Sequence, residues 1–142
     1  MRWRLAAGLV LAAVAGVGAY VRLAPSDPAR WHVAPEAAGP WGEVTAGEGW
    51  ASLRLPPGRG EPRALLARLD AVALATPRTL RLAGSVAEGR ITWVTRSALW
   101  GFPDYTTAEA RADGLYLRAR LRFGRGDMGV NAARLKDWLS RL

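Results

Sequence analysis

An uncharged apolar run lies near the start of the sequence. Residues 5–21 consist mainly of Ala, Val, Leu and Gly, with Tyr20 near the end, and arginines flank the run on both sides. As a helix this run would span about 25 Å, slightly less than the roughly 30 Å hydrocarbon core of a bilayer. We predict that residues 1–22 form a transmembrane anchor. The alternative is a cleaved signal peptide, because small residues precede Tyr20.

The charges beside this run set its expected orientation. Arg2, Arg4 and the amino terminus carry slightly more positive charge than Arg22 and Arg30 on the other side. Because the more positive flank normally stays in the cytoplasm, we expect a single-pass protein of the inner (plasma) membrane. The rest of the chain would then lie on the periplasmic, or extracytoplasmic, side.

A stretch rich in proline and glycine, residues 23–60, comes next. Its prolines interrupt any helical period, so we expect an irregular arm. Within this arm, residues 51–55 alternate between apolar and polar side chains and predict a short edge strand. We expect Trp41 and Trp50 to pack the arm onto the rest of the domain, whereas Trp31 could either pack or insert at the membrane surface.

Residues 61–142 have the pattern of a small domain with helices at both ends. One helix is predicted to open at Glu61, with a proline in its first turn, and to end before Pro77, since apolar residues recur at i, i+4 and i+7. A second helix over residues 128–141 follows Asp127, whose carboxylate would accept hydrogen bonds from the first free amides.

Four strands are predicted between these helices. Alternating apolar and polar residues define them, and an Asp-Gly turn between the last two is typical of a hairpin. The predicted strands are residues 79–86, 90–99, 105–112 and 115–123. The expected fold class is α+β: an N-terminal membrane helix, then a four-stranded antiparallel meander with two helices packed on one face.

The amino-acid composition limits the kinds of catalytic and metal sites that the chain can form. The chain of 142 residues has no cysteine and one histidine, which excludes disulfides and thiol chemistry and argues against histidine-rich metal sites and most histidine-dependent triads. We predict no cofactor and no metal. The formal net charge is +8, with the basic excess in residues 78–142. An anionic lipid or other anionic ligand is therefore the expected partner, and export makes nucleic acid an unexpected one.

The last predicted strand has an arginine-rich face. Tyr116, Arg118, Arg120 and Arg122 alternate with apolar residues, so they would point away from the two helices. Further arginines, one of them close to Glu109, lie on the neighbouring strands. Such a face is usually just solvated. The alternative is an anion-binding surface, because the guanidinium fork matches phosphate and carboxylate groups.

Two motifs carry a resemblance to a known family. Residues 96–104 read RSALWGFPD, and residues 118–134 read RARLRFGRGDMGVNAAR. Together they resemble the bacterial and plastid family of domains of unknown function numbered 1499. Residues 62–142 fit this family throughout, and residues 23–33 fit it loosely. Its members commonly have an N-terminal membrane segment, but the resemblance implies no activity.

The chain departs from the family pattern at three places. The aspartate pair that often follows the proline of the first motif is Asp104-Tyr105 here, so a two-carboxylate site is not expected. Ala119 and Leu121 stand where serines are frequent, which argues against a serine nucleophile. The cysteine found near the start of family members is absent from residues 25–30, and with it any redox or metal role there.

The second motif also predicts a polar cluster. Asn131 and Arg134, one helical turn apart, could hold the last helix to Asp104 through hydrogen bonds and an ion pair. The functional alternative places Arg96, Arg122 and Arg134 around a bound anion, with Asp104 orienting them. The candidate binding residues are therefore Arg96, Asp104, Arg118, Arg120, Arg122, Asn131 and Arg134. No catalytic residue is predicted.

We expect a membrane-anchored, exported domain that binds a ligand or partner without catalysing a reaction. One alternative is a hydrolase or transferase acting on an anionic lipid or cell-wall fragment, with Asp104 as general base. Another is a structural subunit of a membrane complex that docks through the small residues of its apolar run or through the arm. The surroundings of Asp104 distinguish a catalytic from a structural role. A carboxylate that is open to a substrate favours catalysis, whereas one that is paired with Arg134 favours a structural role.

Overall fold

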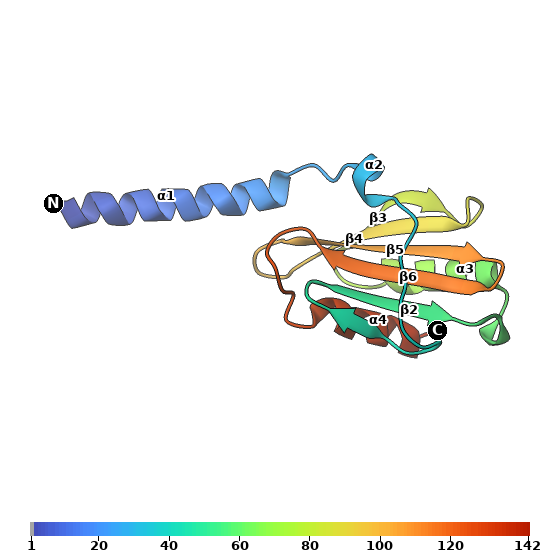
Figure 1. Ribbon diagram of the computed structural model, residues 1–142. Coiled ribbons are helices and arrows are strands. Elements are labelled where there is room, and N and C mark those ends of the chain that lie inside the picture. Colours follow the sequence, from blue (N-terminus) through green and yellow to red (C-terminus); the bar gives the residue numbers. More distant parts are fainter. Residues whose placement is uncertain (1) are drawn as a thin grey trace.

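A six-stranded antiparallel sheet forms the centre of the protein in the computed structural model, which describes residues 2–142 (Figure 1). Its strands are β1 (Thr45–Gly47), β2 (Trp50–Leu55), β3 (Thr79–Ser85), β4 (Arg90–Arg96), β5 (Pro103–Arg111) and β6 (Gly114–Leu121). They lie in the order β1-β2-β6-β5-β4-β3, and every neighbouring pair is antiparallel. The fold class is α+β.

The prediction of four strands is wrong, because the arm supplies two more. β2 is not at the edge of the sheet: it lies between β1 and β6, with Leu53 opposite Leu117. Both side chains are fully buried, so this pairing removes apolar surface from water and also satisfies the backbone groups along β6. β1 has only three residues, too few to show a strand period in the sequence.

The described chain contains four α-helices, α1 (Arg2–Leu23), α2 (Pro28–Trp31), α3 (Pro62–Leu74) and α4 (Val130–Ser140). The single turn of α2 breaks the expectation of a helix-free arm. It forms because the Asp27 carboxylate accepts a hydrogen bond from the Ala29 amide and because proline is well tolerated in a first turn. Glu61 caps α3 in the same way, through the amides of Arg63 and Ala64.

The main core lies between one face of the sheet and the helices α3 and α4 (Figure 1). Trp93 of β4 and Trp138 of α4 are fully buried there and meet edge to face, with ring centroids 5.6 Å apart. The indole of Trp93 donates to Asp70 and that of Trp138 donates to Thr76, both at 2.9 Å. Both indole N–H groups are thus satisfied inside an otherwise apolar layer.

The arm covers the opposite face of the sheet. In Figure 1 it runs from α2 across β5 and β6 before it turns into β1. Trp31 is buried at its start, where its ring stacks on Tyr105 at a centroid distance of 3.9 Å. Val94 and Leu82 complete this second, smaller apolar cluster. Trp31 therefore packs against the sheet.

α1 projects from one end of the sheet (Figure 1). The segment Trp3–Leu23 is long and apolar enough to cross a membrane, and it is almost wholly exposed; a signal sequence has the same properties. We call the end of the domain beside α1 the anchor end. It consists of the α3–β3 turn (residues 75–78), the β4–β5 loop (97–102) and the β6–α4 segment (122–129).

Candidate functional site

The polar cluster predicted from the second motif forms beneath α4. Nη2 of Arg134 lies 3.3 Å from Oδ2 of Asp104, and Nη1 of Arg134 donates to Oδ1 of Asn131 at 2.6 Å. The Arg134 and Asp104 side chains are only 9% and 14% exposed. The cluster therefore ties the start of α4 to the start of β5.

The beginning of α4 differs slightly from the prediction. The helix starts at Val130, two residues later than expected, after Met128 and Gly129 adopt left-handed backbone conformations. Asp127 still satisfies the first free amides: its carboxylate accepts hydrogen bonds from Gly129 at 3.1 Å and from Asn131 at 2.9 Å. Burial would raise the pKa of Asp127, but these hydrogen bonds outweigh it and lower the pKa below its usual value.

At Asp104, unlike at Asp127, burial has a larger effect on the pKa than the opposing interactions combined. Burial raises its pKa, and the ion pair and hydrogen bond with Arg134 only partly offset that effect. Nδ2 of Asn131 and Oγ1 of Thr106 are among four buried side-chain atoms of the described residues that have no hydrogen-bond partner. The geometry is that of a buried ion pair, with one carboxylate oxygen committed to Arg134.

Two arginines of β6 and Arg122, which directly follows the strand, form hydrogen bonds to the arm. Arg118 donates to the carbonyl of Glu36 at 3.0 Å, and Arg120 donates to the carbonyl of Trp31 at 2.7 Å. Arg122 reaches the carbonyl of Pro25 at 2.8 Å. Each of these three arginines thus donates to a backbone carbonyl of the arm.

Neighbouring strands extend this pattern. Arg54 of β2 donates to the carbonyl of Gly39, and Arg111 of β5 donates to that of Pro35 at 3.0 Å. Glu109 lies between Arg111 and Arg90 and forms ion pairs with both. Burial alone would raise the pKa of Glu109, but the hydrogen bonds from these two arginines lower it overall.

The single histidine belongs to the same face. Nδ1 of His32 lies 2.9 Å from Oγ1 of Thr92, whose hydroxyl in turn lies 2.9 Å from that of Thr107. Thr107 also donates to the carbonyl of Trp31 at 3.3 Å. Burial, and then the positive charge of Arg90, lower the pKa of His32, so the imidazole is neutral at pH 7. Residues 2–142 hold no cluster of three or more metal-binding side chains.

The structure does not bring all the predicted site residues together. Arg134 and Asn131 meet Asp104 on the helix-covered face, whereas Arg122 lies on the arm-covered face against the hydroxyl of Tyr105. Arg96 belongs to a third group at the anchor end: its Nη1 donates to the carbonyl of Gly101 at 2.9 Å and contacts that of Val21 at 3.4 Å.

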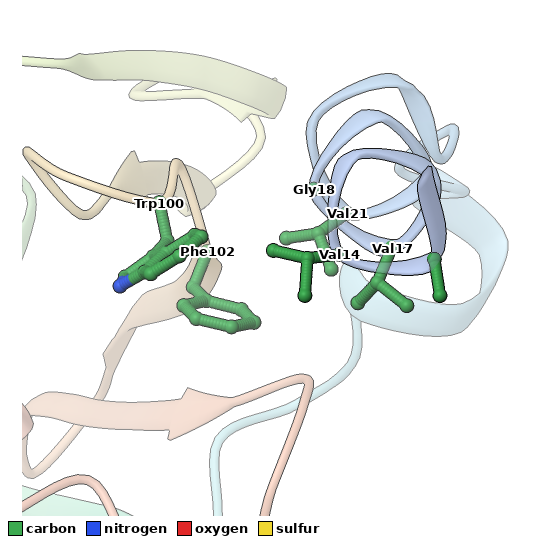
Figure 2. A pocket seen from close by; sticks show the side chains of 7 residues that line it. Val14, Val17, Gly18, Val21, Trp100 and Phe102 are labelled. Carbon is green, nitrogen blue, oxygen red and sulfur yellow. The ribbon is translucent and has the colours of Figure 1, made fainter. Parts of the chain in front are cut away.

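An apolar groove at the anchor end was not predicted from the sequence. It encloses about 440 Å³ between α1 and the β4–β5 loop. Figure 2 shows Trp100 and Phe102 extending from the loop toward Val14, Val17 and Val21 of the helix. The signal available in the sequence was the apolar composition of this loop, which is unusual for an exposed connection.

A model of a family described as a protein of unknown function, DUF1499, matches residues 24–142. The chain belongs to the DUF1499 family. The match confirms the resemblance seen in the two motifs and also covers the arm, which the motifs did not include. Within this DUF1499 domain the first motif forms the end of β4 and the loop facing α1, and the second runs from β6 into α4. No curated protein and no solved structure matches the chain.

Proposed function

We propose that this DUF1499 protein is a membrane-anchored, exported domain that binds a ligand or partner without catalysing a reaction. The observation that carries the proposal is a contrast within the molecule. Asp104, Arg118 and Arg120 make contacts within the fold, while the apolar surface of α1 has no protein partner over most of its length.

The exposed apolar surface of α1 supports the anchoring. Leu9, Leu11 and Val17 are between 62% and 73% exposed, so the helix would present a continuous hydrophobic surface to water. A bilayer removes that surface from water at no cost in backbone hydrogen bonds, because a helix satisfies its own. The arginines near the N-terminus favour a cytoplasmic start and a domain on the extracytoplasmic side of the inner membrane.

The contacts of Asp104 support a non-catalytic role. A general base needs a carboxylate that can reach a substrate proton, whereas the Asp104 side chain is only 14% exposed and is paired with Arg134. Its raised pKa is the one observation that favours the enzyme alternative. Burial is a sufficient cause of that shift.

Cell fractionation with protease accessibility tests the anchoring and its orientation. The full-length protein should sediment with membranes, and external protease should digest the domain once the outer barrier is opened while the inner membrane stays intact. A soluble protein, or a domain that protease reaches only after the inner membrane is broken, contradicts the proposal. So does an intact mass showing that the mature chain begins at Tyr20.

A matched pair of variants separates anchoring from folding. Leu11→Arg with Val14→Arg places two charges in the middle of α1 and should release the protein from the membrane, because charged side chains are costly there. Ala133→Arg with Lys136→Ala alters exposed positions of α4 and should leave the protein in the membrane fraction. Membrane association unchanged by the α1 charges would contradict the anchor.

A further inference from the structure

Three arginines share a pocket at the anchor end. The pocket encloses about 720 Å³, and its lining includes Arg22, Arg78 and Arg96. Their guanidinium groups donate only to backbone carbonyls: Arg22 to Leu99 at 2.8 Å and Arg78 to Arg96 at 3.1 Å, with Arg96 on Gly101 as described above.

No ion pair in the described part of the chain involves any of these three arginines. The two aspartates at the anchor end are already committed, Asp104 to Arg134 and Asp127 to the amides of α4. Glu48 lies in the β1–β2 turn, at the opposite edge of the sheet from β3 and β4. The pocket therefore concentrates positive charge without a carboxylate to balance it, which favours an anion.

The backbone at Arg78 is strained. This residue has a φ of +58°, in the left-handed region that costs free energy for any residue with a side chain. Its guanidinium donates a hydrogen bond to the backbone carbonyl of Arg96, the last residue of β4. Strained positions cluster where a side chain must be held for a function, and the strain at Arg78 coincides with the charged pocket.

The charged pocket continues into an apolar groove through Arg22. Arg22 also lines a groove of about 640 Å³ together with Leu11, Val14, Leu99 and Trp100. This groove shares Val14, Gly18 and Trp100 with the one drawn in Figure 2, and both are almost wholly apolar. The arginine-lined pocket and the apolar groove along α1 thus adjoin each other at Arg22.

Exposed hydrophobic side chains gather at this same end. Outside α1 the described chain has nine large hydrophobic residues with substantial exposure, and seven of them lie at or beside the anchor end. These seven are Leu74, Leu80, Leu99, Trp100, Phe102, Met128 and Val130. The other two, Val33 and Trp41, lie on the arm. The end of the domain from which α1 emerges is therefore the one suited to a lipid interface.

We propose that the pocket formed by Arg22, Arg78 and Arg96 binds the phosphate of an anionic phospholipid from the leaflet that α1 crosses. One acyl chain of that lipid lies in the groove between α1 and Trp100. The inference rests on the proposed anchoring, because it places this end of the domain at the bilayer. Nothing in the pocket lining would neutralise the ammonium of a zwitterionic lipid, so the site prefers a head group with net negative charge.

Native mass spectrometry of the full-length protein tests the site. The protein is reconstituted in nanodiscs of phosphatidylcholine containing a minor fraction of phosphatidylglycerol, and the lipids retained after release are counted. We expect one phosphatidylglycerol to be retained in strong preference to phosphatidylcholine. Arg78→Gln should lower that retention by about fivefold, the effect of one arginine at an anionic membrane surface. Trp100→Ala should lower retention of any lipid.

The control variants separate a specific site from general charge. Arg59→Gln removes one exposed positive charge at the opposite end of the sheet and should change nothing. Arg78→Lys keeps the charge and should retain most of the preference, and matching thermal melts show that each variant is folded. Equal retention of the two lipids by the wild type, or an equal loss with Arg59→Gln, overturns the proposal.

Inorganic phosphate distinguishes a lipid site from a free-anion site. Phosphate in large excess over the lipid should leave the phosphatidylglycerol bound, since the acyl chain contributes to binding; its displacement would overturn the lipid assignment. A failure of the proposed anchoring can be distinguished from a failure of the proposed lipid site. A mature chain that starts at Tyr20 in cells refutes the anchor, whereas an embedded full-length chain without lipid preference refutes only the pocket.

Discussion

The sheet has two covered faces, one under α3 and α4 and the other under the arm. Under the helices, side chains such as Leu53, Trp93 and Trp138 are fully buried in an apolar layer. Under the arm the apolar contacts are fewer, chiefly those of Trp31 with Tyr105 and of Trp41 with Tyr116. Many of the other contacts are hydrogen bonds from guanidinium groups to backbone carbonyls.

The two faces differ because the helices satisfy the hydrogen bonds of their own backbone and the arm does not. A helix satisfies its peptide groups internally and needs only an apolar face toward the sheet. The arm is largely irregular, so its carbonyls accept hydrogen bonds from side chains of the sheet. Arg118, Arg120 and Arg122 supply them. The arginine-rich strand thus has a structural explanation within the chain itself.

The largest effect is expected on the helix-covered face. Trp138→Ala should lower the free energy of unfolding by roughly 3–5 kcal/mol, because it leaves a large cavity against Trp93 and removes the hydrogen bond to Thr76. Denaturant unfolding of the full chain in detergent measures this. Lys136→Ala, exposed on the same helix, should change the value by less than about 0.5 kcal/mol. Equal effects of the two would refute this account of the core.

The ion pair on the same face should contribute somewhat less. Asp104→Ala leaves Arg134 buried without its partner and should cost about 3 kcal/mol. Asp104→Asn should cost much less, because an amide oxygen can still accept the hydrogen bond and the raised pKa shows that burial disfavours the charge.

A double-mutant cycle decides whether the two side chains act as a pair. Asp104→Ala combined with Arg134→Ala should destabilise by clearly less than the sum of the single changes. Additive effects would mean that the contact contributes nothing of its own. Asp137→Ala, which removes an exposed ion pair with Arg141 in α4, is the control and should cost less than about 1 kcal/mol.

The two faces also differ in how far the sequence predicts them. The period of apolar residues gave α3, α4 and the four strands from β3 to β6, since burial against a helix leaves a regular pattern. The contact of Arg134 with Asp104 followed from spacing and charge. The site at which Arg120 binds could not be predicted, because every residue has a carbonyl and nothing in the sequence marks the one at Trp31 as its acceptor.

The anchor end shows a second limit. The loop residues that stand out in the sequence as apolar are Leu99, Trp100 and Phe102. Their contact with α1 depends on where the junction between α1 and the arm lies on the sheet. Arg22 and Arg96 hold that junction through carbonyls of the loop and of α1. The sequence pattern cannot predict a junction that is made by backbone carbonyls. As for the arm, every residue has a carbonyl, and nothing in the sequence marks the ones that accept.

On the arm-covered face, a single arginine should have an intermediate effect. Arg120→Met keeps much of the packing against Trp31 but leaves the Trp31 carbonyl without its charged donor, which should cost about 2 kcal/mol. The loss should be local: limited proteolysis should cut residues 24–40 faster while the helix-covered core keeps its protection. Arg59→Met, at an exposed position outside residues 24–40, serves as control. Uniform loss of protection would contradict the distinction between the faces.

The smallest expected effect is a difference in pH dependence. Asp104 has a pKa raised from its ordinary value of 3.8, so the folded protein binds this proton more tightly than the unfolded chain does. Its contribution to stability therefore increases as the pH falls through the folded pKa toward 3.8. Glu109, on the other face, has a pKa lowered from 4.5, so its contribution is complete above 4.5 and is lost as the pH falls through its lower folded pKa.

These opposite signs can be measured with two isosteric changes. The stability lost by Asp104→Asn relative to the wild type should grow on acidification from pH 6 to about pH 4, because only the wild type gains from protonation. The stability lost by Glu109→Gln should instead shrink as the pH falls below about 4.5, because the wild type then loses the ion pairs with Arg90 and Arg111. Parallel pH profiles for the two variants would contradict the assignment of a desolvated carboxylate to one face and an arginine-paired carboxylate to the other.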